Sequence, residues 1–250
     1  MRTGAHRWQT LASRLLDIVY TPLCALCREV LQDGRSLCER CARDLPRLTP
    51  PFCATCAEPF HGQIDGAFEC HNCSDLAFAF TFARPALLRD DRTRDLIHQL
   101  KYGRAIHLAG ELGRLAAEAF ADERLQPALA AHWPLVPVPL HRARFQHRTF
   151  NQAAEIARSV ATHTGLPLLA ALTRCRRTDT QALLGRKQRL ENLHGAFAVT
   201  PAGRRQLATS GAGVILIDDV LTTGSTVDAC ATTLRRAGFK TVLVVTVMRG

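Results

Sequence analysis

The sequence predicts an α/β protein with a largely parallel sheet, preceded by a small cysteine-rich module. After residue 73, short apolar segments typical of strands alternate with segments of helical periodicity, as in βαβ units. Residues 214–217 (VILI) are all apolar, which indicates a strand in the middle of the sheet. Before residue 74, eight of the chain's ten cysteines gather as four C-x-x-C pairs, which indicates a separate module.

Length and composition limit the architecture. The chain has 250 residues, 47% hydrophobic and 22% charged, which suits one sizeable domain and a small one. No apolar run approaches the roughly 20 residues that a membrane span needs. Residues 1–20 carry apolar side chains at helical spacing, and no small-residue cleavage site follows. We therefore expect an N-terminal amphipathic helix, no membrane span and a cytoplasmic protein.

The four C-x-x-C pairs predict two structural zinc ions. A C-x-x-C turn directs two thiolates at one ion, and two such turns complete a closed tetrahedral site. The segment has too few large apolar side chains for a core, so metal must supply much of its folding energy. The predicted ligands are Cys24, Cys27, Cys38, Cys41, Cys53, Cys56, Cys70 and Cys73.

The pairing of these cysteines is open at this level. Sequential pairing gives two adjacent ribbons and alternate pairing a cross-braced module; the gap within each site favours the sequential order. His61 and His71 are alternative ligands that eight cysteines make unnecessary. A disulfide framework would require an oxidising compartment. Because four sulfur ligands leave no open coordination position, the module is structural or contacts a partner.

We divide the chain into residues 1–20 (helix), 21–75 (double zinc ribbon) and 76–250 (α/β domain). Strands are expected within residues 74–88, 133–140, 166–177, 195–199, 213–217 and 240–248. Helices are expected within residues 91–103, 107–125, 150–166 and 226–238.

Two adjacent acids and a loop of small residues follow the apolar run at 214–217. Ligands of parallel sheets bind at the carboxyl ends of the strands, where Asp218 and Asp219 lie. A loop of small residues before a helix offers backbone N–H groups and the positive end of the helix dipole to a phosphate. The expected phosphate site comprises Thr222, Thr223, Gly224, Ser225 and Thr226. Carboxylates beside a phosphate must bind hydroxyls or Mg²⁺, and ribose 5-phosphate has a phosphate at one end and hydroxyls at the other.

The segment VILIDDVLTTGST resembles the signature for 5-phosphoribosyl 1-pyrophosphate (PRPP) in type I phosphoribosyltransferases. PVPLHRARFQHRTFNQ, IHQLKYG and RKQRLENLHGAF resemble blocks of ComF-type proteins, which also carry a double zinc ribbon. The resemblance covers nearly the whole chain. One departure is Thr149, where that family usually has glycine.

The resemblance implies a type I phosphoribosyltransferase-like fold and a role for each motif. Asp218 and Asp219, the candidate catalytic residues, would hold the ribose hydroxyls, and residues 222–226 the 5-phosphate. Pro139, Leu140, His141 and Arg142 would form the loop for pyrophosphate and Mg²⁺. The basic stretch 174–189 would contain a closing lid. Residues 78–102 would hold the acceptor, with no readable specificity.

Three functions remain open. The first is transfer of the phosphoribosyl group to a nitrogen base or amine. The second is a PRPP-binding protein of DNA uptake or DNA utilisation, as the ComF resemblance implies. The third is a non-catalytic zinc-ribbon adaptor that binds single-stranded DNA or a competence protein and senses PRPP or nucleotide. The net charge of +10 is compatible with phosphate-rich partners, or reflects a background preference for arginine.

Overall fold

The computed structural model describes residues 22–32, 34–60, 62, 64, 66, 68–74, 77–176, 193, 195–209 and 213–250. They belong to two compact units, Met1–Leu45 and Pro46–Gly250. The expected N-terminal helix and most of the expected lid lie outside the described residues. Within the described part, no helix combines the length and apolar character needed to cross a bilayer.

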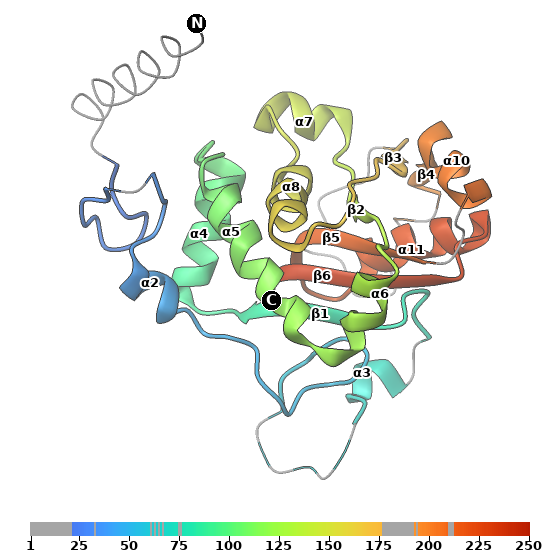
Figure 1. The fold of residues 1–250 in the computed structure, drawn as a ribbon, viewed down its shortest axis with the longest axis horizontal. Helices are drawn as coiled ribbons and strands as arrows, with labels where there is room; N and C mark the ends of the chain where they lie inside the picture. Colours follow the sequence, from blue (N-terminus) through green and yellow to red (C-terminus); the bar gives the residue numbers. More distant parts are fainter. Residues whose placement is uncertain are drawn as a thin grey trace, which may run out of the picture. The chain divides into compact units, whose positions relative to one another are not determined.

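The larger unit contains a four-stranded parallel sheet (Figure 1). Its strands are β1 (Ala83–Leu88), β2 (Leu135–Pro137), β5 (Gly213–Leu221) and β6 (Thr241–Arg249). Their order is β1-β6-β5-β2, so the two most apolar segments of the sequence form the two central strands. The predicted α/β fold with a parallel sheet is confirmed.

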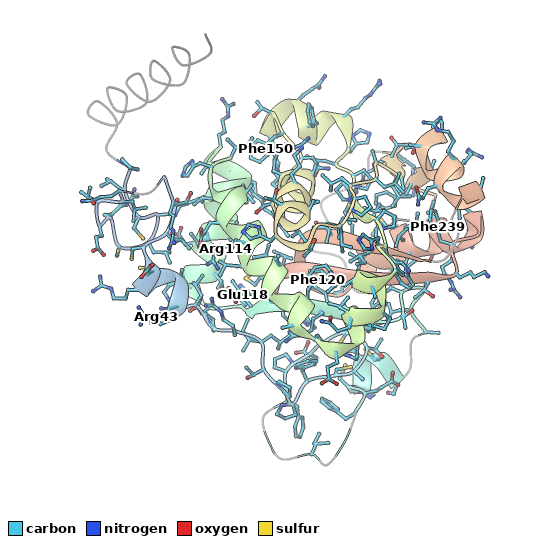
Figure 2. The ribbon with its side chains drawn as sticks, viewed as in Figure 1. Arg43, Arg114, Glu118, Phe120, Phe150 and Phe239 are labelled. Carbon is cyan, nitrogen blue, oxygen red and sulfur yellow. The ribbon has the colours of Figure 1, made fainter. Side chains whose placement is uncertain are left out.

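Helices cover the sheet. The principal ones are α4 (Asp91–Tyr102), α5 (Leu108–Ala117), α8 (Gln152–Thr164) and α11 (Ser225–Ala237). Val227, Cys230 and Leu234 of α11 pack in one buried cluster with Val214 and Leu216 of β5. Phe120 and Phe150, labelled in Figure 2, are also buried. The apolar period of each helix therefore predicts the face that it buries.

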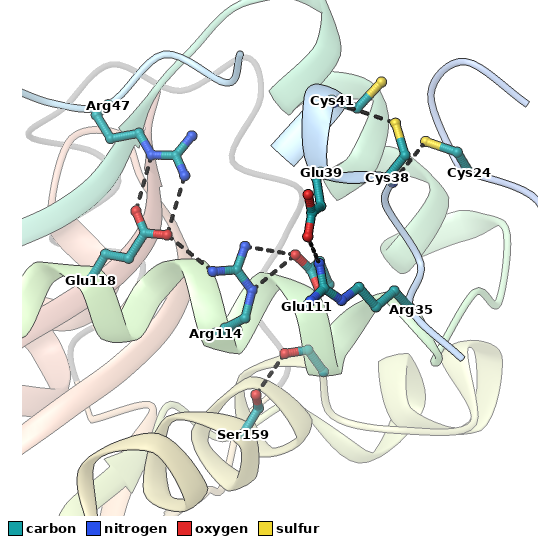
Figure 3. A network of polar contacts seen from close by, with 11 residues as sticks. Cys24, Arg35, Cys38, Glu39, Cys41, Arg47, Glu111, Arg114, Glu118 and Ser159 are labelled. Carbon is teal, nitrogen blue, oxygen red and sulfur yellow. Dashed lines mark hydrogen bonds and ion pairs between the residues drawn. The ribbon is translucent and has the colours of Figure 1, made fainter. Parts of the chain in front are cut away.

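Helices α5 and α8 approach closely at Gly113. A Cβ atom there would lie 2.3 Å from Cβ of Ser159, so only glycine fits. The Ser159 hydroxyl donates to the carbonyl of Gly110 at 2.6 Å (Figure 3). Glu118, which directly follows α5, accepts from Arg47 at 3.0 Å and pairs with Arg114 of α5 at 3.3 Å. These contacts fix α5 between α8 and the chain near residue 47.

Shorter elements complete the chain. They are α2 (Glu39–Arg43), α3 (His71–Ser74), η1 (Glu118–Ala121), η2 (Glu123–Leu125), α6 (Gln126–Ala130), α7 (Arg142–Arg148) and α10 (Pro201–Thr209). Strands β3 (Leu172–Arg174) and β4 (Phe197–Val199) form a separate antiparallel pair.

Two expected elements differ from the structure. The helix expected over 107–125 ends at Ala117 and continues as 3₁₀ turns, because Asp122 adopts an extended backbone and pairs with Arg84 at 3.0 Å. The strand expected within 74–88 begins only at Ala83. Phe78 and Phe80, which precede it, stack at 4.6 Å and pack on the core.

Candidate functional site

A cavity of about 300 Å³ opens at the carboxyl edge of the sheet. Strand β2 pairs with β5 only as far as Ile217, whereas β5 continues to Leu221 beside β6. The end of β5 is therefore uncovered on its β2 side. The lining residues are Lys101, Tyr102, Val138, Pro139, Leu140, Arg148, Asn151, Gln152, Ala153, Arg174, Asp218, Asp219, Val220, Thr222 and Thr226.

The acidic pair lies in this cavity, within the last part of β5. Successive side chains of a strand point to opposite faces, so the two carboxylates point in different directions. Asp219 is buried, and its Oδ2 lies 2.9 Å from Nζ of Lys101 at the end of α4. The backbone N–H of Asp219 donates to Oδ1 of Asp218 at 2.9 Å. Lys101 thus balances one of the two charges.

The pKa of the second carboxyl group, that of Asp218, is strongly raised. Removal from water and the neighbouring charge of Asp219 raise the pKa of Asp218 to about 7, although Lys101 and Arg174 oppose the shift. At neutral pH, Asp218 is therefore poised between its acid and carboxylate forms. A cation or hydroxyl groups that bind here would favour the ionised form.

The β5–α11 loop forms the next part of the wall. Thr222 and Thr226 line the cavity, and α11 begins at Ser225 without a side-chain cap, so its first-turn N–H groups are available to an anion. The hydroxyl groups of Thr223 and Ser225 form a hydrogen bond with each other at 2.9 Å. Neither of them, nor Gly224, is among the lining residues.

Two features of the backbone at position 224 favour glycine. Its φ of 77° lies in the left-handed region, and a Cβ atom would meet Cε1 of Phe78 at 3.3 Å. The β5–α11 loop therefore packs at Gly224 against the ring of Phe78, in the segment before β1.

An arginine behind the loop fixes its backbone. Nη1 of Arg249, at the end of β6, donates to the carbonyls of Leu221 and Thr222 at 2.8 Å each. Its Nη2 pairs with the carboxylate of Glu58. Arg249 is buried, and Glu58 lies two residues after Cys56. The loop is thus connected to the second cysteine module through one guanidinium group.

The eight N-terminal cysteines form two groups of four. Cys24, Cys27, Cys38 and Cys41 form the first, and Cys53, Cys56, Cys70 and Cys73 the second. Within each group the sulfur atoms lie within 4.8 Å of one another. The structure therefore has the sequential pairing, with one group in each compact unit.

The donor set of both groups fits zinc. The backbone N–H of Cys38 donates to Sγ of Cys24 at 3.4 Å, and that of Cys70 to Sγ of Cys53 at 3.3 Å. Such bonds stabilise thiolates, the form in which sulfur binds metal. Figure 3 shows Cys24, Cys38 and Cys41 of the first group. Four sulfurs at this separation can hold one tetrahedral Zn²⁺.

The pKa values follow from these bonds. Burial raises the pKa of Cys24, but the N–H groups of Cys27, Cys38 and Leu26 outweigh burial and lower it to about 6. In the second group, burial likewise opposes the N–H groups of Cys56 and Cys70, which lower the pKa of Cys53 to about 7. Each group therefore has one thiol that ionises readily and can begin metal binding.

Known proteins resemble this chain along most of its length. A family model described as a double zinc ribbon domain matches residues 15–75. The DNA utilization protein YhgH of Escherichia coli O157:H7 is 32% identical over 232 residues, 89% of this chain and 94% of that protein. The chain belongs to the ComF family.

Other relatives agree with this assignment. YhgH of Salmonella typhimurium LT2 is 31% identical over 234 residues, 92% of this chain and 91% of the relative. Competence protein F of Haemophilus influenzae is 26% identical over 230 residues, 88% of this chain and 94% of the relative. Residues 15–75, which the family model matches, contain both cysteine groups.

Thr149, where the resemblance to ComF-type proteins implies glycine, has a backbone conformation typical of glycine. Thr149 has a φ of 68°, a left-handed conformation that disfavours β-branched residues. Its backbone N–H donates to the carbonyl of Phe145 at 2.6 Å, and its hydroxyl to the carbonyl of Arg148 at 2.5 Å. The turn from α7 to α8 is therefore kept in spite of the threonine.

Two residues of this site, Arg148 and Gln152, were not predicted, and only their motif, RTFNQ, could have indicated them. Lys101 and Arg174 also line the cavity; they lie in the stretches 78–102 and 174–189, which the resemblance assigns to the acceptor and the lid. Of the expected pyrophosphate loop, Pro139 and Leu140 line the cavity. His141 precedes α7, and Arg142 is its first residue; neither is among the lining residues.

Proposed function

We propose that this ComF-family protein binds PRPP with Mg²⁺ in the cavity and acts as a phosphoribosyltransferase linked to DNA utilisation. The observation that carries the proposal is the arrangement around Asp218 and Asp219. The two acids line one cavity with Thr222 and Thr226. Thr226 lies in the first turn of α11, a helix of 13 residues. A phosphosugar offers a phosphate to the helix and hydroxyls to the acids.

Each part of the ligand has a proposed partner. The 5-phosphate would bind the hydroxyls of Thr222 and Thr226 and the backbone N–H groups of 223–225. The ribose hydroxyls would donate to Asp218 and Asp219. Pro139, Leu140, His141 and Arg142 follow β2, whose end lies beside the acids, so their loop would face the pyrophosphate. The acceptor would bind near Tyr102, which is 60% exposed.

The reaction would be displacement at the anomeric carbon. The bond from C1 of the ribose to the pyrophosphate oxygen breaks, and pyrophosphate leaves with the electron pair. A bond forms from C1 to a nitrogen of the acceptor, which loses its proton to solvent. Mg²⁺, when bound, would supply positive charge to the pyrophosphate. The carboxylates of Asp218 and Asp219 would stabilise the positive charge that develops on the sugar.

Unfolding experiments with and without PRPP and Mg²⁺ test the proposal. Ligand at about 100 times its dissociation constant should stabilise the fold by roughly 2.7 kcal/mol. The double variant Asp218→Asn/Asp219→Asn should lose most of this effect. Asp91→Asn/Asp95→Asn on α4 is the control, since it changes the net charge equally at positions that do not line the cavity. Equal responses of wild type and the Asp218/Asp219 variant would exclude the assignment.

A role in DNA utilisation is proposed from the relatives' names. One group is named for DNA utilization and another for competence. The net charge of +10 suits such a setting. Because thiolate ligands must stay reduced, we also propose that the protein works in a reducing compartment, the cytoplasm. A competence protein is the candidate partner, from the name of one relative.

A second candidate function is a non-catalytic adaptor that binds single-stranded DNA and uses the PRPP cavity as a sensor. Phe60 of the second cysteine module favours it, because the ring is 40% exposed and lies 5.2 Å from that of Phe68. Bases stack on such rings. Phe52, by contrast, lies beneath the guanidinium group of Arg84 at 4.9 Å.

Titration of labelled single-stranded and duplex DNA separates the two functions. If the adaptor exists, binding favours the single strand, weakens steeply with salt and falls in Phe60→Ala. The Asp218→Asn/Asp219→Asn variant should bind DNA as wild type does, because the cavity is sized for one phosphosugar. Salt-independent binding or a duplex preference would exclude the adaptor.

A further inference from the structure

A second cavity, of about 540 Å³, lies between the second cysteine group and the segment that leads to β1. Its volume is within the range of small-molecule sites. It shares no lining residue with the cavity at Asp218 and Asp219. Part of its wall is α3, which Figure 1 shows beside the sheet. The lining residues are Thr55, Glu69, Cys73, Ser74, Ala77, Phe78, Phe80 and Thr81.

The charge of this cavity is opposite to the charge of the chain. The chain has a net charge of +10, yet no lysine, arginine or histidine is among the described residues that line the cavity. Glu69 supplies a carboxylate, and Cys73 belongs to the second cysteine group. Four thiolates leave two negative charges in excess when they hold one Zn²⁺, so the wall at Cys73 is anionic as well. The cavity therefore repels phosphate groups and attracts cations.

The Glu69 carboxylate is held in place at this wall. The Thr55 hydroxyl donates to Oε1 of Glu69 at 2.6 Å. A carboxylate has about four acceptor positions on its two oxygens, so one hydroxyl leaves room for further donors. Two parallel N–H bonds from a guanidinium group are the strongest arrangement that a carboxylate accepts.

Two aromatic rings form the adjoining wall. Phe78 and Phe80 stack with their centroids 4.6 Å apart and their planes 23° apart. Phe80 is buried, whereas Phe78 is half-buried. The face of an aromatic ring attracts a cation, and a planar guanidinium group stacks on it. One cavity thus offers a guanidinium group both of its preferred partners, a carboxylate and a ring.

We infer that this cavity binds a guanidinium group, with Glu69 as its carboxylate and Phe78 as its stacking ring. An arginine side chain of a partner protein and a free guanidinium compound share this chemistry. The inference does not depend on PRPP, because the two cavities have no lining residue in common. It gives the second cysteine group a role in binding beside its role in folding.

NMR titration of the zinc-loaded full chain tests the inference. The probe is N-acetyl-argininamide, and its matched control is N-acetyl-citrullinamide, in which a neutral urea group replaces the guanidinium group. We expect the first probe to shift the amide signals of residues 69–74 and 77–81 with saturation. The control should bind at least about 10-fold more weakly, the typical loss when a charged hydrogen-bond partner is removed.

Two further probes distinguish the sources of the group. Acetyl-Gly-Arg-Gly-amide represents a side chain of a partner protein, and agmatine represents a free compound. Tighter binding of the peptide would assign the site to a protein partner, and tighter binding of agmatine to a small molecule. Equal binding of N-acetyl-argininamide and N-acetyl-citrullinamide, or no binding of either, would overturn the inference.

Variants of the wall test the assigned residues. Glu69→Gln removes the charge but keeps an acceptor for Thr55, so the fold is retained and affinity for N-acetyl-argininamide should fall at least about 10-fold. Thr81→Lys adds a cation at an exposed lining residue and should weaken binding as well. Glu123→Gln makes the same change as Glu69→Gln at an exposed residue outside the cavity and should have no effect. Thermal unfolding checks that each variant folds.

The acid pair of the first cavity is the other place where a cationic probe could bind. Asp218→Asn/Asp219→Asn should therefore bind N-acetyl-argininamide as wild type does, because neither residue lines the second cavity. Unchanged affinity in folded Glu69→Gln would overturn the inference. Loss of binding in the folded Asp218/Asp219 variant would place the probe at the acid pair and overturn it as well.

Discussion

The ionised form of Asp218 is unfavourable in the ligand-free protein, and a bound cation or hydroxyl group would stabilise it. Burial and the charge of Asp219 raise the pKa of the Asp218 carboxyl group, and the Lys101 ammonium group is already paired with Asp219 at 2.9 Å. A raised pKa means that the folded chain binds a proton more tightly than the unfolded chain does. Stability is therefore greatest when Asp218 is protonated.

We predict that the free energy of unfolding falls between about pH 4 and about pH 7, because in this window Asp218 is ionised in the unfolded chain but still protonated in the folded chain. The pKa is raised to about 7, so the stabilisation is present below the unfolded-state pKa and is lost as pH rises through the folded-state value. Asp218→Asn should remove this slope and be more stable than wild type at about pH 8, by on the order of 1–3 kcal/mol. Urea unfolding of the zinc-loaded protein measures it. Parallel pH profiles for wild type and Asp218→Asn would contradict the prediction.

Thr149 offers a second test at the scale of one residue. We predict that Thr149→Gly stabilises the protein by up to about 1 kcal/mol, because glycine adopts a positive φ without strain. The φ of Thr149 is 68°. Thr162→Gly inside α8 is the control and should destabilise by roughly 0.3 kcal/mol, because glycine is a weaker helix former than threonine. Chemical denaturation measures both. A stability loss in Thr149→Gly equal to that of the control would show that the left-handed backbone carries no strain.

Among the elements, the β5–α11 loop depends on the chain that precedes β1. The Arg249 guanidinium group holds the carbonyls of Leu221 and Thr222 and is itself held by Glu58. Phe78 packs both on the main core and beside the second cysteine group. The geometry of the phosphate loop is therefore decided partly by residues far away in sequence.

We predict that Glu58→Leu lowers stability by about 1–3 kcal/mol and weakens PRPP binding, because it leaves the buried guanidinium group of Arg249 without its carboxylate. Glu58→Gln, which keeps an acceptor, should have a smaller effect. Glu118→Leu is the control: it removes a carboxylate paired with Arg47 and Arg114 on α5, so only stability should change. Calorimetry and urea unfolding measure both quantities. Unchanged PRPP affinity in Glu58→Leu would show that the loop holds its shape without Glu58.

At the scale of the whole molecule, the two cysteine groups belong to different units. The second group lies in the unit that contains the sheet and is joined to it by several hydrogen bonds. The N–H of Ala83 in β1 donates to the carbonyl of Thr55 at 2.8 Å, and Arg124 donates to the carbonyl of Ala54 at 2.9 Å. The first group lies within Met1–Leu45.

We predict that loss of zinc from the two groups has different consequences. Metal analysis should find about two zinc ions per wild-type chain and about one in either Cys24→Ser/Cys27→Ser or Cys53→Ser/Cys56→Ser. Only the second variant should lower the main thermal transition and PRPP affinity, because its group is bonded to β1. The first should unfold residues near 22–45 alone. Equal shifts of the main transition in both variants would show that the units are not independent in stability.

The sequence by itself determined the features that depend on local pattern. Alternating apolar periods predict the α/β fold, and the spacing of eight cysteines predicts two metal sites. The apolar run before Asp218 and the small residues after Asp219 place an anion site at the end of a strand. These features could be read because strand period, thiol spacing and loop composition are properties of adjacent residues.

The tertiary structure alone decided which distant residues meet. Lys101 ends a helix more than a hundred residues before Asp219, yet the parallel order β1-β6-β5-β2 brings α4 to the end of β5. In the sequence, Gln152 is an ordinary residue in the first turn of a helix; only the structure shows that its side-chain carbonyl accepts from Arg148. Likewise, nothing near Arg249 in the sequence indicates Glu58. Such contacts depend on strand order and helix packing, which are set by long-range burial and which a local pattern does not contain.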